Sequence, residues 1–175
     1  PSGRYVSGDY GTQNATVFLL WNKGTDGVWY CIREYYYSGR TEGKQKTDSE
    51  NADDLESWLE ETKIKGIIVD PSAASFIAEL RKRGYKVVKA KNNVEDGIRV
   101  VGTKLNQEAI IFADSCVNTI QEFGSYIWDE AAAAHGEDRP VKEHDHAMDA
   151  LRYFVYTILN NQTAIIQSKR KAGFH

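Results

Sequence analysis

The chain has 175 residues, of which 41% are hydrophobic and 27% charged, ordinary proportions for one globular domain. Its formal net charge of −3 is not the strongly basic balance of most nucleic-acid-binding domains, so any contact with nucleic acid must come from local clusters. It contains no secretory leader and no apolar run of roughly 18 residues, so we expect an intracellular protein without a membrane span. Cys31 and Cys116 each lie in an apolar run, which predicts buried, reduced thiols.

The N-terminal part of the chain alternates β-branched or aromatic runs with turn residues. Strands are expected from Arg4 to Asp9, from Ala15 to Trp21 and from Val28 to Tyr37. The segment from Asn22 to Gly27 supplies turn residues between the second and third runs. This order predicts an antiparallel meander. Because the chain starts at Pro1 and enters a strand within a few residues, we also expect it to be a domain of a longer polypeptide.

The remainder alternates helical and extended patterns. Apolar or packing residues at positions 55, 58, 59 and 62 predict a helix from Ser49 to Lys63. Further strands are expected at Gly66 to Asp70, Tyr85 to Ala90 and Glu108 to Phe112. Further helices are expected from Pro71-Ser72 to Gly84, over Val94 to Leu105, from Asp114 or Ser115 to Phe123, and from about His144 to Leu159.

These elements predict an α/β domain with a mixed sheet of five or more strands, antiparallel first and then parallel, flanked by helices. We expect residues 1–160 to form this domain. Residues 161–175, which include Lys169, Arg170 and Lys171, are expected to be a flexible basic tail.

Three aspartates occupy positions that this topology would bring together. Asp9 ends the first strand, and Asp70 ends the fourth strand at a carboxyl edge, where α/β sheets collect their ligand sites. Asp149 lies on the last helix and shares a face with Asp145 and His146, which precede it by four and three residues. Clustered carboxylate oxygens are what Mg²⁺ or Mn²⁺ requires, and such carboxylates cannot all stay ionised cheaply without a cation.

Each of these residues also has a plainer interpretation. Asp9 could be a turn residue, and Asp70 could cap the helix that follows it. Asp145 could be a partner of the helix dipole in a first turn, and His146 could be an ordinary surface histidine. Asp149 is the hardest to explain in this way, because it lies beyond the predicted first turn and beside the apolar stripe of its helix.

Basic residues are clustered in two places that could contact phosphates or could simply be solvated faces. Within one eleven-residue stretch the basic residues are Arg81, Lys82, Arg83, Lys86, Lys89 and Lys91. A second group, Arg40, Lys44 and Lys46, lies in a glycine-containing loop. That loop resembles a phosphate-binding loop, but it has too few residues between Gly39 and Gly43 and a glutamine at position 45, so we expect no ATP hydrolysis.

Several segments resemble the acidic motifs of the nuclease domains of phage terminase large subunits. They are Gly8-Asp9-Tyr10-Gly11, Ile68-Val69-Asp70-Pro71-Ser72-Ala73 and the run from His144 to Tyr153. The segments 43–50 and 90–98 are similar to that family as well. The similarity extends over roughly Arg4 to Leu159, and its specificity lies in the order of the motifs and in the His146-x-x-Asp149-Ala-x-Arg-Tyr string.

This resemblance implies an RNase H-like fold with strand order 3-2-1-4-5. It implies that Asp9, Asp70 and Asp149 bind two Mg²⁺ or Mn²⁺ ions, with His146 near or on the second metal and Asp145 as a possible accessory. The implied activity is two-metal cleavage of double-stranded DNA concatemers during genome packaging, in the cytoplasm of the infected bacterium. The implied partners are an ATPase domain on the same polypeptide, a small terminase subunit and a portal protein.

Three other interpretations of the sequence remain open. Asp9-Tyr10-Gly11-Thr12 matches the phosphate signature of actin-like and sugar-kinase-like nucleotide-binding domains, although those proteins use two such domains. Another RNase H-like nuclease, such as a Holliday-junction resolvase, would share the acidic residues. A catalytically silent DNA-docking module would not need them.

Overall fold

The structure is a computed structural model, and it describes residues 3–11, 14–124 and 145–160. Its strands are β1 (Arg4–Asp9), β2 (Ala15–Lys23), β3 (Trp29–Ser38), β4 (Gly66–Val69), β5 (Val87–Lys89) and β6 (Ile110–Phe112). Its helices are α1 (Gly39–Glu42), α2 (Asp48–Leu59), α3 (Ala74–Lys82), α4 (Val94–Asn106), α6 (His146–Phe154) and the π-helical η1 (Val155–Leu159). Residues 117–124 are also helical. The predicted basic tail lies outside the described residues.

The strands form one mixed sheet in the order β5-β4-β1-β2-β3-β6. β1, β2 and β3 are an antiparallel meander, β4 pairs parallel with β1, and β5 pairs parallel with β4. The expected mixed sheet and the expected 3-2-1-4-5 order are therefore confirmed. The short β6 adds a parallel strand beyond β3, a position that the sequence pattern does not specify.

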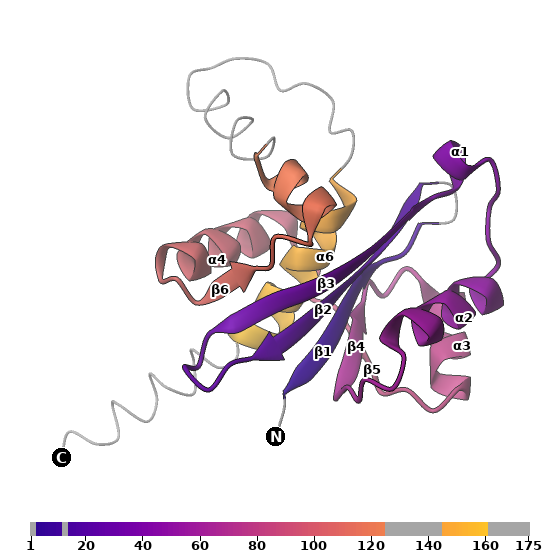
Figure 1. Cartoon of the computed structure of the whole chain (residues 1–175), viewed down its shortest axis with the longest axis horizontal. Helices are drawn as coiled ribbons and strands as arrows, with labels where there is room; N and C mark the ends of the chain where they lie inside the picture. Colours follow the sequence, from indigo (N-terminus) through magenta and orange to yellow (C-terminus); the bar gives the residue numbers. More distant parts are fainter. Residues whose placement is uncertain (1–2, 12–13, 125–144, 161–175) are drawn as a thin grey trace.

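Helices cover both faces of the sheet, with α4 and α6 on one side and α2 and α3 on the other (Figure 1). Because strand side chains alternate between faces, Val17, Leu19 and Trp21 of β2 join the core beneath α6, and Phe18 and Leu20 join the core beneath α2 and α3. The sheet thus separates two apolar cores, and each of them holds its helices in place.

Aromatic stacking anchors both cores. On one face Trp21 stacks on Phe154 of α6 with ring centroids 4.3 Å apart, and its indole N–H donates to Ser7 Oγ at 3.0 Å. On the other face Tyr10 stacks on Phe76 of α3 at 4.1 Å. Full burial of such side chains stabilises the fold by roughly 1.5–3 kcal/mol each, so the helices that carry them are firmly placed.

Several predicted element boundaries are wrong, and those of α2, α3 and β5 show the reasons. α2 ends at Leu59 instead of Lys63, because the backbone at Glu60 turns to φ 54°. α3 begins at Ala74 instead of Pro71-Ser72, because Asp70 Oδ1 accepts a hydrogen bond from the Ser72 amide at 2.8 Å and holds a turn there. β5 is shorter than the predicted strand from Tyr85 to Ala90.

Three further expectations concern the last helix, the two cysteines and membrane spans. α6 and η1 together form the predicted last helix, which begins at His146; its expected start at His144 lies outside the described residues. Cys31 and Cys116 are buried free thiols with sulfur atoms 3.8 Å apart, as predicted. None of the helices in the described part of the chain is both long and apolar enough to cross a membrane.

Candidate metal centre

Asp9 and Asp70 come together because β1 and β4 are parallel neighbours. Gly8 is opposite Val69 in the register of the two strands, so the residues that follow them share one carboxyl edge. Ile68 joins the core beneath α6, and strand alternation places Asp70, two residues later, on the same face. The same alternation, counted from Ser7, places Asp9 there as well. Both carboxylates are therefore on the face that α6 covers.

α6 brings the other two predicted residues to that edge. His146 is the first residue of the helix, and its Nδ1 lies 2.8 Å from Asp9 Oδ2. Asp149 lies three residues later, in the first turn of α6, so the expectation that it lies beyond the first turn is wrong. Its side chain is 28% exposed and accepts a hydrogen bond from Arg152 at 3.0 Å. Asp145 is the N-cap residue, and its side chain makes no capping hydrogen bond. The structure thus joins His146 directly to Asp9 across the sheet–helix interface.

The pKa values of these groups are shifted because the groups are buried and lie close to one another. Burial, together with the charges of Asp9 and Asp145, raises the pKa of Asp149 to about 6 against the opposing effect of Arg152. The hydrogen bond with Asp9 raises the pKa of His146 above its usual value, although burial opposes this. Negative charge is therefore concentrated at this edge, where it is only partly balanced.

Asp70 behaves differently from Asp149. Burial alone would raise its pKa, but hydrogen bonds from Ser72, from Asn92 at 3.2 Å and from Tyr153 lower it below its ordinary value. The hydrogen bonds around Asp70 thus favour its ionised form.

Tyr153 is a buried tyrosine close to the three aspartates. Its side chain is 5% exposed, and its pKa is raised by burial and by the charges of Asp9, Asp149 and Asp70. Because the charges of all three predicted acids raise the pKa of this one phenol, the acids lie near the same edge of the sheet. Sequence reasoning did not single out Tyr153, although it lies one helical turn after Asp149 and faces the same edge.

The chemistry of the donor set fits a hard divalent cation, since it consists of carboxylate oxygens and one imidazole. Within residues 3–11, 14–124 and 145–160, however, no three His, Cys, Asp or Glu side chains lie close enough together to hold one metal ion. Asp9 instead contacts His146, Asp149 contacts Arg152, and Asp70 contacts Ser72 and Asn92. A bound cation would replace or rearrange these hydrogen bonds.

Two further residues, to which the sequence analysis assigned no role, hold the centre in shape. Arg152 is 7% exposed and donates both to Asp149 and, at 2.9 Å, to the carbonyl of Asn92, so it ties α6 to the segment after β5. Gly97 of α4 makes room for it, because a Cβ there would lie 2.6 Å from Arg152 Cγ. Glu122, 9% exposed, accepts hydrogen bonds from the Ala147 and Met148 amides at the start of α6.

Burial raises the pKa of Glu122 to about 7, even though the two α6 amides favour its ionised form. The only signal in the sequence that could have found it is its spacing. Glu122 lies three residues after the buried Thr119, so the two share one face of the helix. An acidic residue on a buried helix face is stable only when a hydrogen-bond donor or a positive charge pairs with it.

The predicted DNA-binding residues are divided between two edges of the sheet. Lys89 ends β5, which runs parallel to β4, so Lys89 and Lys91 lie at the same edge as the aspartates. The residues at the end of α3 and before β5 lie at the opposite edge; they are Arg81, Lys82, Arg83 and Lys86.

Three of the predicted basic residues are paired with acids inside the protein. Arg83 contacts Asp53, Glu56 and Glu79. Lys44 pairs with Glu50 at 3.2 Å, and Lys46 pairs with Asp54 and lies over the ring of Tyr37. These charges are partly neutralised before any DNA approaches. The remaining lysines of the long cluster are exposed.

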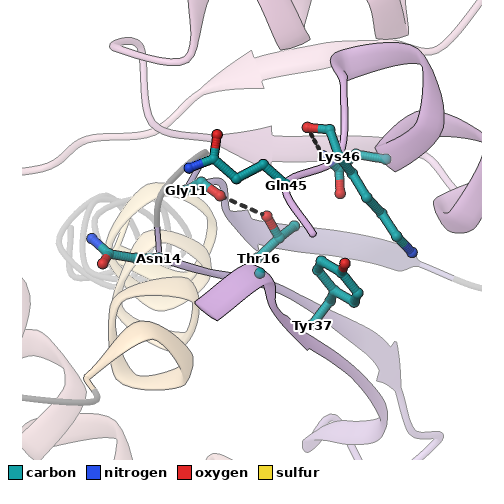
Figure 2. Close-up of a pocket in the computed structure, with 8 residues that line it drawn as sticks. Gly11, Asn14, Thr16, Tyr37, Gln45 and Lys46 are labelled. Atoms are coloured by element: carbon teal, nitrogen blue, oxygen red, sulfur yellow. Dashed lines mark hydrogen bonds between the residues drawn. The ribbon is translucent and has the colours of Figure 1, made fainter. Parts of the chain in front are cut away.

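A small polar pocket lies beside the carboxyl end of β1 (Figure 2). It is lined by Gly11, Asn14, Thr16, Tyr37, Gly39, Gln45, Lys46 and Asn51. Thr16 donates to the Gly11 carbonyl at 3.2 Å and the Asn51 amide donates to the Lys46 carbonyl at 3.4 Å, so the lining is cross-linked (Figure 2). No carboxylate lines this pocket, so it is separate from the aspartate cluster.

Known proteins similar to this chain are phage terminases. The chain is 28% identical over 153 residues to the terminase large subunit of Escherichia phage T5, covering 85% of the chain and 33% of that protein. It is 57% identical to the large terminase of a thermophilic bacteriophage, solved in complex with ADP, with a TM-score of 0.81 over 91% of this chain and 40% of that one. The chain thus spans two-fifths or less of these relatives.

Isolated nuclease domains share the fold. The P22 large terminase nuclease domain superposes with a TM-score of 0.66 at 20% identity, covering 91% of this chain and 84% of that one. The large terminase nuclease of thermophilic phage G20c with bound zinc superposes at 0.62 with 13% identity, covering 87% and 80%. None of the protein-family models matches the chain. The RNase H-like fold and the resemblance to terminase large subunits are therefore confirmed.

Proposed function

We propose that this chain, which resembles the nuclease domains of phage terminase large subunits in sequence and fold, is a divalent-metal-dependent DNA endonuclease. The observation that carries the proposal is that Asp9 and Asp70 share one carboxyl edge of the sheet, to which α6 brings Asp149 and places His146 Nδ1 2.8 Å from Asp9 Oδ2. The similarity to a terminase nuclease solved with bound zinc, and also with bound cobalt, supports the binding of a divalent metal.

Asp9, Asp70 and Asp149 would hold two Mg²⁺ or Mn²⁺ ions, and His146 would add a nitrogen ligand. When bound, such cations lower the pKa of a water molecule and stabilise the leaving 3′-oxygen of a phosphodiester. Each side chain has a distinct part in this. Asp70 is already ionised by its hydrogen bonds, whereas Asp149, with a pKa of about 6, becomes fully ionised when positive charge arrives.

Arg152 and Tyr153 orient these ligands without needing to bind metal. Arg152 donates to Asp149, and Tyr153 donates to Asp70, so both carboxylates are oriented before a cation binds. No protein nucleophile is required, because a water molecule attacks the phosphorus atom.

Double-stranded DNA would be held through its phosphates. Lys89 and Lys91 are the best placed of the predicted basic residues, because they share the edge of the aspartates. Lys44 and Lys46 remain candidates once DNA displaces their acidic partners, whereas Arg81, Lys82 and Lys86 lie at the far edge and Arg83 is engaged by three acids. Contacts of this kind position the backbone and read no sequence.

In the whole protein, the substrate would be concatemeric phage DNA, cut in the cytoplasm of the infected bacterium as it is packaged. An ATPase domain on the same polypeptide would deliver the DNA, together with a small terminase subunit and a portal protein. Delivery by a motor raises the effective DNA concentration, which suits a domain with a net charge of −3.

A plasmid-nicking assay with Mg²⁺, Mn²⁺, Ca²⁺ or EDTA tests the proposal. The parent should cut with Mg²⁺ and at least as well with Mn²⁺, and should not cut with Ca²⁺ or EDTA. Asp70→Ala should lose on the order of 1000-fold in rate, because several kcal/mol of charge stabilisation disappear. Asp26→Ala, an exposed turn aspartate between β2 and β3, is the matched control and should cut like the parent.

Two results would contradict the proposal: nicking by the parent in EDTA, or unimpaired nicking by Asp70→Ala. A strong preference for four-way junctions over linear duplex would instead identify a resolvase. Tight ATP binding without cleavage would identify a nucleotide-binding domain of the actin-like kind.

A further inference from the structure

The first turn of α6 is held by a residue from elsewhere in the chain. The first amides of any α-helix have no partner within the helix, and Asp145, at the N-cap, does not provide one with its side chain. The Ala147 and Met148 amides donate instead to Glu122 Oε2, at 2.8 and 3.2 Å. A buried carboxylate therefore caps the helix that carries His146 and Asp149.

Glu122 belongs to the helical residues 117–124, which follow β6 and lie against the end of α6 from which His146 projects (Figure 1). The carboxylate is favourably placed there, because the N-terminus of a helix carries a partial positive charge. Its second oxygen accepts from the Tyr36 hydroxyl at 3.5 Å, so β3 also restrains it.

Residues 117–124 are fixed by a second carboxylate that acts in the same way. Glu34 of β3 accepts from the Asn118 amide at 2.7 Å and from the Thr119 amide at 2.9 Å. The Thr119 hydroxyl donates to the same glutamate at 2.7 Å. The sheet thus holds the segment through Glu34, and the segment holds α6 through Glu122.

We infer that Glu122 is a positioning residue of the metal centre: by binding the Ala147 and Met148 amides it sets where His146 and Asp149 meet Asp9. Glu34 supports it by fixing residues 117–124 to the sheet. The catalytic consequence rests on the proposed nuclease function, whereas the capping contact and its effect on metal affinity do not.

The test compares Glu122→Ala and Glu122→Gln with the parent and with Thr47→Ala. Thr47 caps α2 by accepting from the Glu50 amide at 3.2 Å, so its variant loses a helix cap on an element that carries none of the three candidate metal ligands Asp9, Asp70 and Asp149. The three measurements are hydrogen exchange at the Ala147 and Met148 amides, Mn²⁺ affinity by electron paramagnetic resonance, and plasmid nicking at saturating DNA.

Glu122→Ala should accelerate exchange at both amides and weaken both Mn²⁺ affinity and the nicking rate about 10- to 100-fold, with the KM for DNA unchanged. Glu122→Gln keeps an acceptor oxygen and should recover most of this loss, and it also serves if the alanine variant does not fold. Thr47→Ala should lower the melting temperature alone.

If Glu122→Ala loses only thermal stability, as Thr47→Ala does, with amide exchange and Mn²⁺ affinity unchanged, the inference is overturned. A parent that binds Mn²⁺ but does not cut DNA would overturn the proposed function alone. In that case the exchange and Mn²⁺ measurements still decide the role of Glu122.

Discussion

The two faces of the sheet are built from similar apolar material but differ in how their charges are balanced. Beneath α2 and α3, charged groups find opposite partners; Arg83, for example, contacts three acids. Beneath α6, acids gather around other acids, and burial raises the pKa of Asp149 to about 6 and that of Glu122 to about 7. One face is electrostatically satisfied, and the other keeps an excess of negative charge that a cation can relieve.

Matched truncations in the two cores provide the strongest test of whether the two faces of the sheet differ in function. Leu80 of α3 and Leu151 of α6 are both fully buried, one on each face. Leu80→Ala and Leu151→Ala should each lower the free energy of unfolding by about 2–5 kcal/mol. Only Leu151→Ala should also reduce metal-dependent nicking per folded molecule, because α6 carries His146 and Asp149.

The measurements are urea denaturation and nicking at a temperature where both leucine variants are folded. Equal losses of nicking in the two variants would show that the faces do not differ in function.

The raised pKa of Asp149 on the α6 face should make the free energy of unfolding depend on pH. In the folded chain Asp149 has a pKa of about 6, against an ordinary value of 3.8, so between these pH values only the folded state holds the proton. The free energy of unfolding therefore falls as pH rises from about 4 to 6, and the loss persists above pH 6. A pKa difference of this size corresponds to at most about 3 kcal/mol.

Asp149→Asn removes this penalty while keeping an oxygen that can accept from Arg152. The metal-free variant should be more stable than the parent at pH 8, by about 1–3 kcal/mol, and indistinguishable from it near pH 4. Thermal unfolding in EDTA across this range measures the difference. A variant less stable than the parent at pH 8 would mean that the pairing with Arg152 outweighs the repulsion.

The smallest expected effect concerns the two edges of the sheet. Lys89→Ala with Lys91→Ala should weaken duplex binding on all sequences alike and reduce the slope of log affinity against log salt by about 2. Lys82→Ala with Lys86→Ala, at the opposite edge, should leave this slope unchanged. Fluorescence anisotropy over a salt series measures this slope. If Lys82→Ala with Lys86→Ala reduced the slope more, DNA would bind at the edge of the sheet opposite the aspartates, which would contradict the proposal.

The features that could be predicted from the sequence are those that local pattern and chain order determine. Period-two alternation and turn residues marked the strands, and the positions of Asp9 and Asp70 at the ends of two strands predicted which edge of the sheet brings them together. The strand order came from the resemblance to terminase nucleases. Neither pattern nor spacing could show that β6 pairs with β3, because such a short strand carries no information about its partner.

The residues that were missed act through contacts between distant segments. Glu122 meets α6 across 25 residues of sequence, and Glu34 meets Asn118 across 84. Arg83 looked like part of a continuous basic cluster because its partners Asp53 and Glu56 are on another helix. Charge along a sequence therefore did not indicate which charges the fold neutralises.

The most direct measurement is the anomalous scattering of Mn²⁺ in crystals of the parent protein soaked with the metal. The convergence of acids predicts Mn²⁺ within coordination distance of Asp9, Asp70 and Asp149, with His146 rotated or shared between Asp9 and the metal. Asp70→Ala crystals should lose or weaken that peak. Mn²⁺ bound elsewhere on the domain, with this edge of the sheet empty at saturating metal, would contradict the assignment of the α6 face as the metal centre.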